Sequence, residues 1–281
     1  MQRSEVTFYA RSLGLMFLAI TLFTAIPFKA FSKDTVRFCI PSADVYPFFS
    51  FDQAEISGTN PDIMRAVFAK PALQNVNLEF VQRPWKRCNV ELQQGSIDFI
   101  IGSYTGARDD VAVYPNELGL DIEETVFSTA DVCFISAKGE QLDRTQRGIA
   151  GENTFTVGAE AGFSQNHADN LAIDWLVIYN HLEKYRLLEK GRVDAISQVC
   201  ALDGVPIATK AEVSGFKDFV TLFPPYLSSP GYIIFSQAFI DNRRELAETI
   251  LREVNTIDKV SIYTQYQSGK NDAANVSNTP E

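Results

Sequence analysis

The sequence predicts an α/β protein of two similar lobes, because one succession of elements occurs twice along the chain. Strand, helix, Gly-x-(Ile/Val)-Asp and strand follow one another over residues 76–102 and again over residues 175–199. Gly95 and Gly191 each come directly after the last periodic residue of the helix, where a left-handed C-terminal cap is easily adopted. The alternative is an ordinary α/β protein in which two Gly-x-x-Asp turns recur by chance.

A further strand and helix precede each of these units, so each lobe is predicted to run strand, helix, strand, helix, strand. The expected strands are 36–40, 76–81, 99–102, 155–159, 175–179 and 195–199, and the expected helices are 60–69, 84–94, 163–172 and 180–190. Parallel strands need a helical crossover between them, and such crossovers are nearly always right-handed. Ligands of open α/β sheets bind outside the carboxyl ends of the strands, so two such lobes suit a small molecule held between them.

The N-terminal residues have the layout of a secretory signal peptide. Residues 1–32 contain Arg3 and Arg11, an apolar run at 13–26, and Ala30-Phe31-Ser32 before a plausible cleavage point. A retained membrane anchor is the alternative, although the run is short for a bilayer span of about 20 apolar residues. No Cys follows the cleavage region, which argues against a lipid anchor. We therefore expect a periplasmic protein with no membrane insertion after signal cleavage.

Four cysteines follow the predicted signal peptide: Cys39, Cys88, Cys133 and Cys200. An oxidising compartment permits disulfides, and four cysteines allow three connectivities. We favour the pairs within each lobe, Cys39 with Cys88 and Cys133 with Cys200, because a bridge between lobes would oppose closure. Buried free thiols are the alternative. With two histidines in the chain and no CxxC motif, neither a metal site nor a cofactor is indicated.

The net charge of −10 argues against a nucleic-acid or anionic-membrane partner, which would require a basic face. An amphipathic stretch at 242–265 is expected to return as a helix to the first lobe. Two crossings between lobes, near 129–135 and 231–236, would then form a two-strand hinge. The expected domains are a signal peptide at 1–32, lobe 1 at 33–131 and 237–266, lobe 2 at 132–236, and a disordered tail at 267–281.

The strand at 99–102 leads into a segment with an anion-binding pattern. Ser103 and Thr105 follow the strand, and Arg108 comes three residues after Thr105, which could cap a short helix. The guanidinium offers a planar fork of donors that matches a carboxylate or phosphate, and helix N-terminal amides add to the same site. The alternative is a surface arginine paired with Asp109 or Asp110.

The second lobe offers a matching turn at residues 157–164. Gly162 allows close approach of the backbone, and the amide of Ser164, with its hydroxyl group, would point at an anion. Glu160 precedes this turn. An ordinary helix start is the alternative.

Aromatic residues after the first strand are candidates for the apolar wall of a ligand site. Tyr46 and Phe48 lie in the run Asp44-Val45-Tyr46-Pro47-Phe48-Phe49-Ser50-Phe51, which could equally pack under a loop. Trp85, at the start of a helix, could also reach the site, although core packing is the stronger interpretation for it.

These motifs together resemble one bacterial protein family. The run Pro84-Trp85-Lys86-Arg87, the turn Gly95-Ser96-Ile97-Asp98, the segment 102–108 and Val113-Tyr114-Pro115 look like the family-3 extracellular solute-binding proteins. These are the substrate-binding components of polar amino acid ABC importers. The likeness extends over nearly the whole mature chain.

The resemblance implies a two-lobe periplasmic-binding-protein-like fold of the second type that closes on its ligand and presents it to a membrane permease. In the family, the Arg of Thr-x-x-Arg holds the ligand α-carboxylate, which corresponds to Arg108, and Gly162 and Ser164 correspond to the assisting turn. We expect a monomer with a small-molecule ligand and the permease of an ABC transporter as partners.

One position departs from the family pattern. Amino-acid binders of the family usually have an Asp that holds the ligand ammonium five residues after the Asp of Gly-x-x-Asp, and this chain has Val199 there. An unpaired ammonium in a closed site would cost several kcal/mol. Either Glu160, Gln198 or Asp203 substitutes, or the ligand is not a typical α-amino acid.

The leading expectation is therefore a non-enzymatic binder of a small carboxylate-bearing solute. A dehydratase-like enzyme on the same fold is the first alternative, with Glu160 or Asp203 as the acid or base. A ligand sensor that acts on a partner protein is the second.

Overall fold

The computed structural model describes residues 34–52, 55–105, 112–160, 171–208 and 218–266. The chain divides into two units, Met1–Asp34 and Thr35–Glu281. The second unit contains the helices and strands of the described residues, and its first strand begins at Asp34. Two predicted segments lie outside the described residues, the signal peptide and the C-terminal tail. The helix expected at 163–172 also lies outside them, except for its last two residues.

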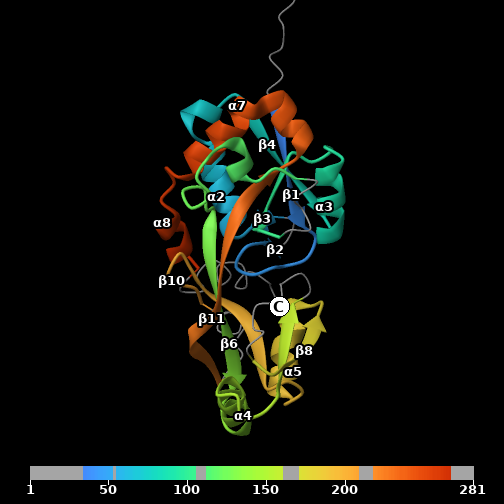
Figure 1. Ribbon diagram of the computed structural model, residues 1–281, viewed down its shortest axis with the longest axis vertical. Coiled ribbons are helices and arrows are strands. Elements are labelled where there is room, and N and C mark those ends of the chain that lie inside the picture. The colour runs from blue at the N-terminus through green and yellow to red at the C-terminus, as the bar shows by residue number, and fades with distance from the viewer. Residues whose placement is uncertain (1–33, 53–54, 106–111, 161–170, 209–217, 267–281) are drawn as a thin grey trace, which may run out of the picture. The chain divides into compact units, whose positions relative to one another are not determined.

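One sheet of nine strands runs through this unit in the order β4-β1-β5-β11-β6-β9-β7-β8, and β10 pairs with β9 (Figure 1). β1 is parallel to β5, and β7 is parallel to both β8 and β9. β2 and β3 form a separate antiparallel pair. The strands are β1 (Asp34–Pro41), β2 (Ser50–Asp52), β3 (Glu55–Ser57), β4 (Val76–Arg83), β5 (Phe99–Ser103), β6 (Ser128–Ala137), β7 (Phe155–Glu160), β8 (Ile173–Ile178), β9 (Ala195–Leu202), β10 (Val205–Pro206) and β11 (Phe219–Phe235).

Six α-helices lie within the described residues. The first lobe contains β1, β4 and β5 with α2 (Thr59–Phe68), α3 (Trp85–Gln93), α7 (Gln237–Val254) and α8 (Lys259–Thr264). The second lobe contains β7, β8 and β9 with α4 (Glu140–Ile149) and α5 (His181–Glu189). Short 3-10 turns occur at Pro71–Leu73 and Pro115–Leu118.

The first lobe has three layers because its strands are apolar on both faces. Along β1, Phe38 and Ile40 join the core that α2 and α7 cover, whereas Cys39 between them joins the core under α3. Successive side chains of a strand point to opposite faces, so this alternation buries both sides of the sheet. Figure 1 shows α2 and α3 on opposite sides of these strands.

The second lobe repeats this arrangement on a smaller scale. Ile196 of β9 packs with Tyr185 and Leu188 of α5, while the preceding Ala195 packs with Phe155 and other residues of the opposite face. Asn180 caps α5, because its side-chain oxygen accepts the amide hydrogens of residues 182 and 183. This confirms the helix start that the sequence predicted.

In both lobes the second helix ends at the predicted glycine. Gly95 and Gly191 have φ values of 69° and 64°, the left-handed region in which glycine carries no Cβ penalty. The amide of Ser96 then donates to the carbonyl of Glu91 at 3.0 Å, which satisfies an otherwise orphaned carbonyl of α3.

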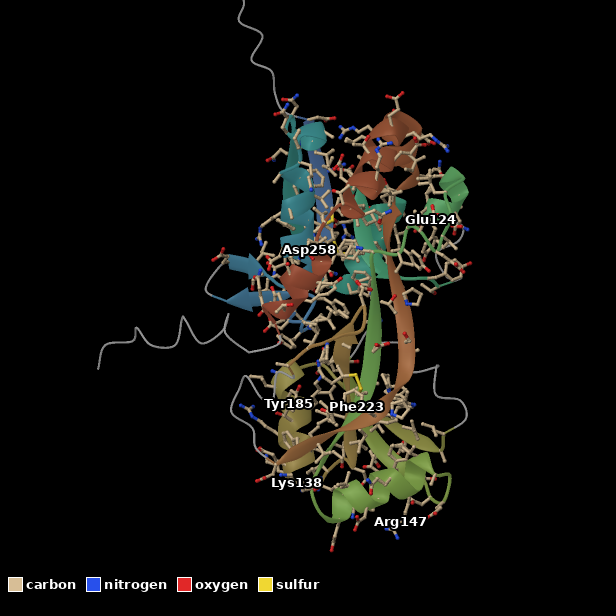
Figure 2. The ribbon with its side chains drawn as sticks, turned by 90° about the vertical axis from the view of Figure 1, so that its left-hand side faces the viewer. Glu124, Lys138, Arg147, Tyr185, Phe223 and Asp258 are labelled. Carbon is tan, nitrogen blue, oxygen red and sulfur yellow. A yellow bond between two sulfur atoms is a disulfide. The ribbon has the colours of Figure 1, made fainter. Side chains whose placement is uncertain are left out.

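The lobes are joined by β6 and β11, which pair with one another as antiparallel strands (Figures 1 and 2). The segments 129–135 and 231–235, where crossings were expected, lie in these two strands. The second crossing segment is the end of a longer element than expected, because β11 is one strand of 17 residues. Its register shifts between Leu222 and Leu227, where Pro224 and Pro225 have no amide hydrogen to donate to the ladder.

Two further differences concern helices. The single helix expected at 242–265 is two helices, because Asp258 starts a new one by accepting the amide hydrogen of Ser261 at 3.1 Å. Helix α4 was not predicted, because its residues are mainly polar and give no apolar stripe of the usual width.

Both disulfides have the favoured connectivity. Cys39 of β1 is bonded to Cys88 of α3, and Cys133 of β6 is bonded to Cys200 of β9 (Figure 2). The alternative of buried free thiols is wrong, since each of the four cysteines is disulfide-bonded. The first bond therefore joins a strand to a helix, and the second joins two paired strands.

Candidate functional site

The predicted site residues lie at or after the ends of β1, β4, β5 and β7. Open α/β sheets bind ligands outside the carboxyl ends of their strands. Arg108, Gly162 and Ser164 lie outside the described residues. Ser103 is exposed at the end of β5, and its hydroxyl oxygen lies 3.0 Å from that of Ser229 on β11. The amide of Thr105 donates to the hydroxyl oxygen of Tyr114 at 3.3 Å.

The aromatic candidates all contact the core of the first lobe. Tyr46 is buried and meets the ring of Tyr266 edge-on, with 6.5 Å between centroids. Phe48 is half-buried and packs against the same core as Phe38. Trp85 is half-buried on the opposite face, near the Cys39 disulfide. Their packing fixes the loop after β1 and the start of α3, whichever parts of the rings reach a ligand.

The main polar feature of the second lobe is a buried ammonium group on Lys184. Its Nζ donates to Glu160 Oε1 at 2.6 Å, to Gln198 Oε1 at 2.5 Å and to the carbonyl oxygen of Ser197 at 3.3 Å. The side chains of Lys184 and Glu160 are 2 % and 9 % exposed. Burial lowers the pKa of Lys184, and the neighbouring carboxylate of Glu160 opposes that shift.

Lys184 was not among the predicted site residues, although the sequence contains a signal for its burial. Lys184 lies four residues before Leu188 and next to Tyr185, both of which are completely buried on one side of α5. A lysine on the apolar stripe of a short helix requires a buried acceptor. The end of β7 supplies it in Glu160, which the parallel pairing of β7 with β9 brings beside Gln198.

Gln198 connects this cluster to the first lobe. Its Oε1 accepts the Tyr185 hydroxyl group at 3.2 Å in addition to Lys184, and its Nε2 donates to the carbonyl oxygen of Tyr46 at 3.4 Å. Because Tyr46 belongs to the loop after β1, one side chain touches a segment of each lobe.

Val199 and Asp203, the other two positions that were considered near the end of β9, also have partners within the protein. Val199 is buried among the apolar residues of the first lobe. Asp203 accepts the amide hydrogen of Thr129 at 2.7 Å on one carboxylate oxygen and the hydroxyl hydrogen of Tyr263 at 3.0 Å on the other. Burial is the largest cause that raises the pKa of Tyr263, followed by the charge of Asp203.

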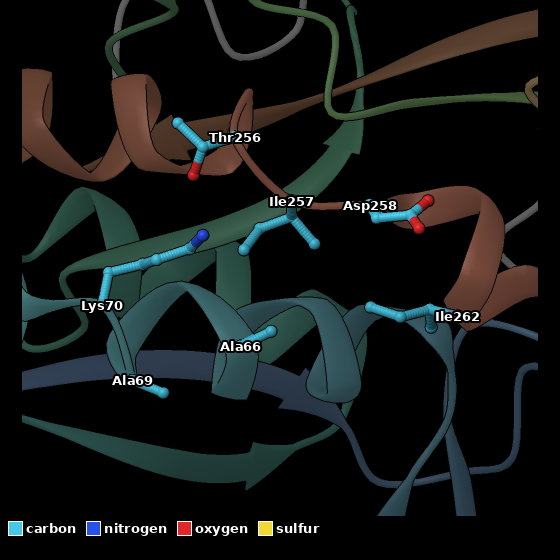
Figure 3. A pocket seen from close by; sticks show the side chains of 7 residues that line it. All are labelled: Ala66, Ala69, Lys70, Thr256, Ile257, Asp258 and Ile262. Carbon is cyan, nitrogen blue, oxygen red and sulfur yellow. The ribbon is translucent and has the colours of Figure 1, made fainter.

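A separate hollow of about 560 Å³ lies between the end of α2 and the turn from α7 to α8 (Figure 3). None of the predicted site residues lines it. Its lining residues are Ala66, Ala69, Lys70, Thr256, Ile257, Asp258 and Ile262.

Among the described residues, no group of three His, Cys, Asp or Glu side chains is placed to hold a metal ion. None of the helices in the same ranges is both long enough and apolar enough to cross a bilayer.

Neither a protein-family model nor a curated protein sequence matches the chain. Solved structures do match it. The probable amino-acid ABC transporter extracellular-binding protein from Bacillus subtilis has a TM-score of 0.64 and 12% identity, with 84% of this chain and 99% of that chain covered.

Two ancestral proteins are similar in the same way. An ancestral amino acid-binding protein, a precursor of cyclohexadienyl dehydratase, has a TM-score of 0.60 and 17% identity over 83% of this chain and 95% of that chain. An ancestral arginine-binding protein bound to glutamine has a TM-score of 0.58 and 20% identity, with 83% of this chain and 98% of that chain covered. At these identities the likeness concerns the fold. The chain therefore has the two-lobe α/β fold of the substrate-binding proteins of amino acid ABC transporters, as its resemblance to the family-3 solute-binding proteins predicted.

Proposed function

We propose that the protein is a periplasmic solute-binding protein that captures a small carboxylate-bearing solute, an amino acid or a related compound, and delivers it to the permease of an ABC importer. The observation that supports this best is the placement of the predicted ligand segments. They follow the ends of β1 and β5 in one lobe and of β7 in the other, and β6 and β11 join the two lobes.

Closure of the lobes around the ligand is part of this proposal. One disulfide joins β1 to α3 and the other joins β6 to β9, so neither bond links the parallel strands of the first lobe to those of the second. Ligand binding would then shift the protein towards a closed form that a permease can recognise. The export signal at 1–32 and a monomeric state belong to the same proposal.

Arg108 is the residue to which we assign the ligand carboxylate. Its guanidinium can form two parallel hydrogen bonds to a carboxylate, which neutral donors cannot match in strength. The amide groups around Gly162 and Ser164 would add donors from the second lobe. Ser103, Thr105, Tyr46, Phe48, Trp85 and Glu160 would line the remaining surface.

The test is ligand-induced thermal stabilisation of the wild-type protein and of Arg108→Ala. A panel of amino acids, organic acids and short peptides is screened for compounds that raise Tm of the wild type. Arg108→Ala should abolish the rise, because the carboxylate loses its cationic partner. Arg147→Ala, which removes an exposed arginine of α4, is the matched control and should keep it. An unchanged rise in Arg108→Ala removes Arg108 from the site.

A dehydratase-like activity is the second candidate, because one structural neighbour is described as a precursor of cyclohexadienyl dehydratase. Glu160 is the acidic residue nearest to the predicted ligand segments in the second lobe, and a general acid or base must lie within about 3 Å of the atom it serves. Turnover of a bound carboxylate by the purified protein would establish this function, and release of the compound unchanged would support binding alone.

A further inference from the structure

We propose that the hairpin formed by β9 and β10 is a third connection between the lobes, besides β6 and β11, and that residues 259–266 fix it to the first lobe. The hairpin anchor consists of residues 199–208 together with Tyr263 of α8 and Tyr266, which follows α8. It restricts how far the lobes move relative to one another. This inference concerns the protein without ligand and does not depend on what the protein binds.

The strand β9 contributes side chains to the cores of both lobes. At its start, Ala195 and Ile196 pack with apolar residues of the second lobe. Towards its end, Val199 and Leu202 belong to the core that α2 and α7 cover in the first lobe, and Ile207 joins the same core after β10. These last three side chains are at most 5 % exposed. Withdrawal of the hairpin from the first lobe would return their apolar surface to water, which is unfavourable.

A β-bulge lies where β9 passes from one core to the other. In the pairing of β9 with β6, Val199 lies opposite Val132 and Ala201 lies opposite Asp131. Cys200 comes between these two pairs and is the extra residue on β9. An extra residue of this kind bends its strand and increases the local twist. The bulge therefore separates the part of β9 that belongs to the second lobe from the part that belongs to the first.

This bulge is attached to the strands that join the lobes. Cys200 is disulfide-bonded to Cys133 of β6. Next to this bond, Asp131 of β6 pairs with Ala201 of β9 on one side and with Ser228 of β11 on the other. Three strands therefore run side by side at this level, and a movement of the lobes has to bend all three of them.

The turn between β9 and β10 is held in place by Asp203. This residue has a φ of 48°, a conformation that persists in a non-glycine residue where the surrounding structure fixes it. Its amide donates to the Thr129 carbonyl oxygen at 2.8 Å, and one carboxylate oxygen accepts the Thr129 amide hydrogen at 2.7 Å. The other carboxylate oxygen accepts the Tyr263 hydroxyl hydrogen at 3.0 Å. The turn is thereby fixed to the start of β6 and to α8.

Tyr266 connects the hairpin to the first lobe. Its carbonyl oxygen accepts the amide hydrogen of Ala208, which follows β10, at 3.2 Å. Its hydroxyl group donates to the Asp62 carboxylate at 2.7 Å and accepts the amide hydrogen of Gly58 at 3.1 Å. Asp62 lies in α2 and Gly58 directly precedes that helix, so one tyrosine contacts both the hairpin and the first lobe. Figure 1 shows β10 beside α8.

The hairpin anchor has one consequence that does rest on the proposed solute-binding function. The apparent affinity of a protein for its ligand is reduced by the fraction of the protein that is in the binding-competent form. A connection that limits the movement of the lobes therefore tunes the affinity without touching the ligand.

The first experiment measures the distance between the lobes by pulsed electron spin resonance, on protein that has been unfolded and refolded to release any bound compound. Spin labels are placed at Glu124, which is exposed in the first lobe, and at Glu189, which is exposed at the end of α5. They are attached through encoded azido side chains, because added cysteines would exchange with the disulfides. Tyr263→Phe with Tyr266→Phe removes both hydroxyl groups of the hairpin anchor and keeps the rings.

We expect this double variant to have a wider distribution of distances than the wild type. The matched control, Ser236→Ala with Thr145→Val, also removes two buried hydroxyl groups, one in each lobe, and should keep the wild-type distribution. Ser236 caps α7 and Thr145 donates to the Asp194 carbonyl oxygen, so both lie outside the hairpin anchor. A folded double variant whose distribution is no wider than that of the wild type, or equal widening in the control, would overturn the inference.

The second experiment is hydrogen exchange at single amides and needs one substitution. In Tyr263→Phe, the Asp203 amide should exchange at least about tenfold faster, because this residue loses a hydrogen bond to its charged carboxylate. The Phe235 amide, which donates to the Val113 carbonyl oxygen in the first lobe, should keep its rate and is the internal control. An unchanged rate at Asp203, or an equal rise at both amides, would overturn the inference even where the double variant does not fold.

Discussion

Removal of the Lys184 ammonium should destabilise the protein more than removal of the whole charged pair. In Lys184→Met, the Glu160 carboxylate stays 9 % exposed and loses a charged donor 2.6 Å away, while Gln198 and the Ser197 carbonyl each lose a hydrogen bond. Breaking a buried ion pair from one side costs about 3–5 kcal/mol, because the remaining charge is uncompensated.

The double variant Glu160→Gln with Lys184→Met should recover most of this loss. Replacing both partners of a buried pair by uncharged residues is often neutral, so we expect a cost of about 1–2 kcal/mol from the hydrogen bonds that are not restored. Glu160→Gln alone leaves a buried ammonium and should resemble Lys184→Met.

The assay is urea unfolding of the wild type, the two single variants and the double variant, which together form a double-mutant cycle. The reasoning predicts a coupling energy of several kcal/mol. It is refuted if Lys184→Met costs less than about 1 kcal/mol, or if the double variant is as unstable as the sum of the two single variants.

Three further results are expected. Replacing Cys39 and Cys88 by Ala should lower the free energy of unfolding by about 4 kcal/mol, because the chain-entropy relation gives this value for a sequence separation of 49. Urea unfolding measures the change, and an unchanged midpoint would contradict the prediction. Gly58→Ala should lower the free energy of unfolding by about 2 kcal/mol or more, since Gly58 has a φ of 117° and a Cβ there would collide with the backbone of Phe48. Equal stability of the variant and the wild type would contradict this prediction. Burial raises the pKa of Tyr266, so the unfolded chain loses this phenol proton first and stability should fall above about pH 10. The fall should be up to about 1.4 kcal/mol per pH unit steeper than in Tyr266→Phe, and parallel curves would exclude this contribution.

The repeated pattern of elements was sufficient to predict the fold because each lobe follows simple rules. Apolar strands with helical crossovers must form parallel sheets, and the glycines after each second helix mark where those helices end. Both disulfides followed from the expectation that neither should oppose closure. The break between α7 and α8 was not predicted, because the apolar stripe continues through it. The new helix begins where the side chain of Asp258 caps it.

The candidate site could be predicted only as a set of loops, for a physical reason. The order of the strands shows which segments meet at the sheet edges, but not which polar groups will pair there. Lys184 illustrates this, because its sequence neighbours indicate burial while its acceptors lie 24 and 14 residues away in Glu160 and Gln198. Long-range hydrogen bonds of this kind depend on the register of β7 and β9, which a single sequence does not specify.

Native mass spectrometry of the protein exported with its own signal sequence and purified without denaturant tests the solute-binding account most directly. We predict one small carboxylate bound per chain, retained by Arg147→Ala and absent from Arg108→Ala. A chain that purifies empty and takes up no compound of the panel would contradict the account.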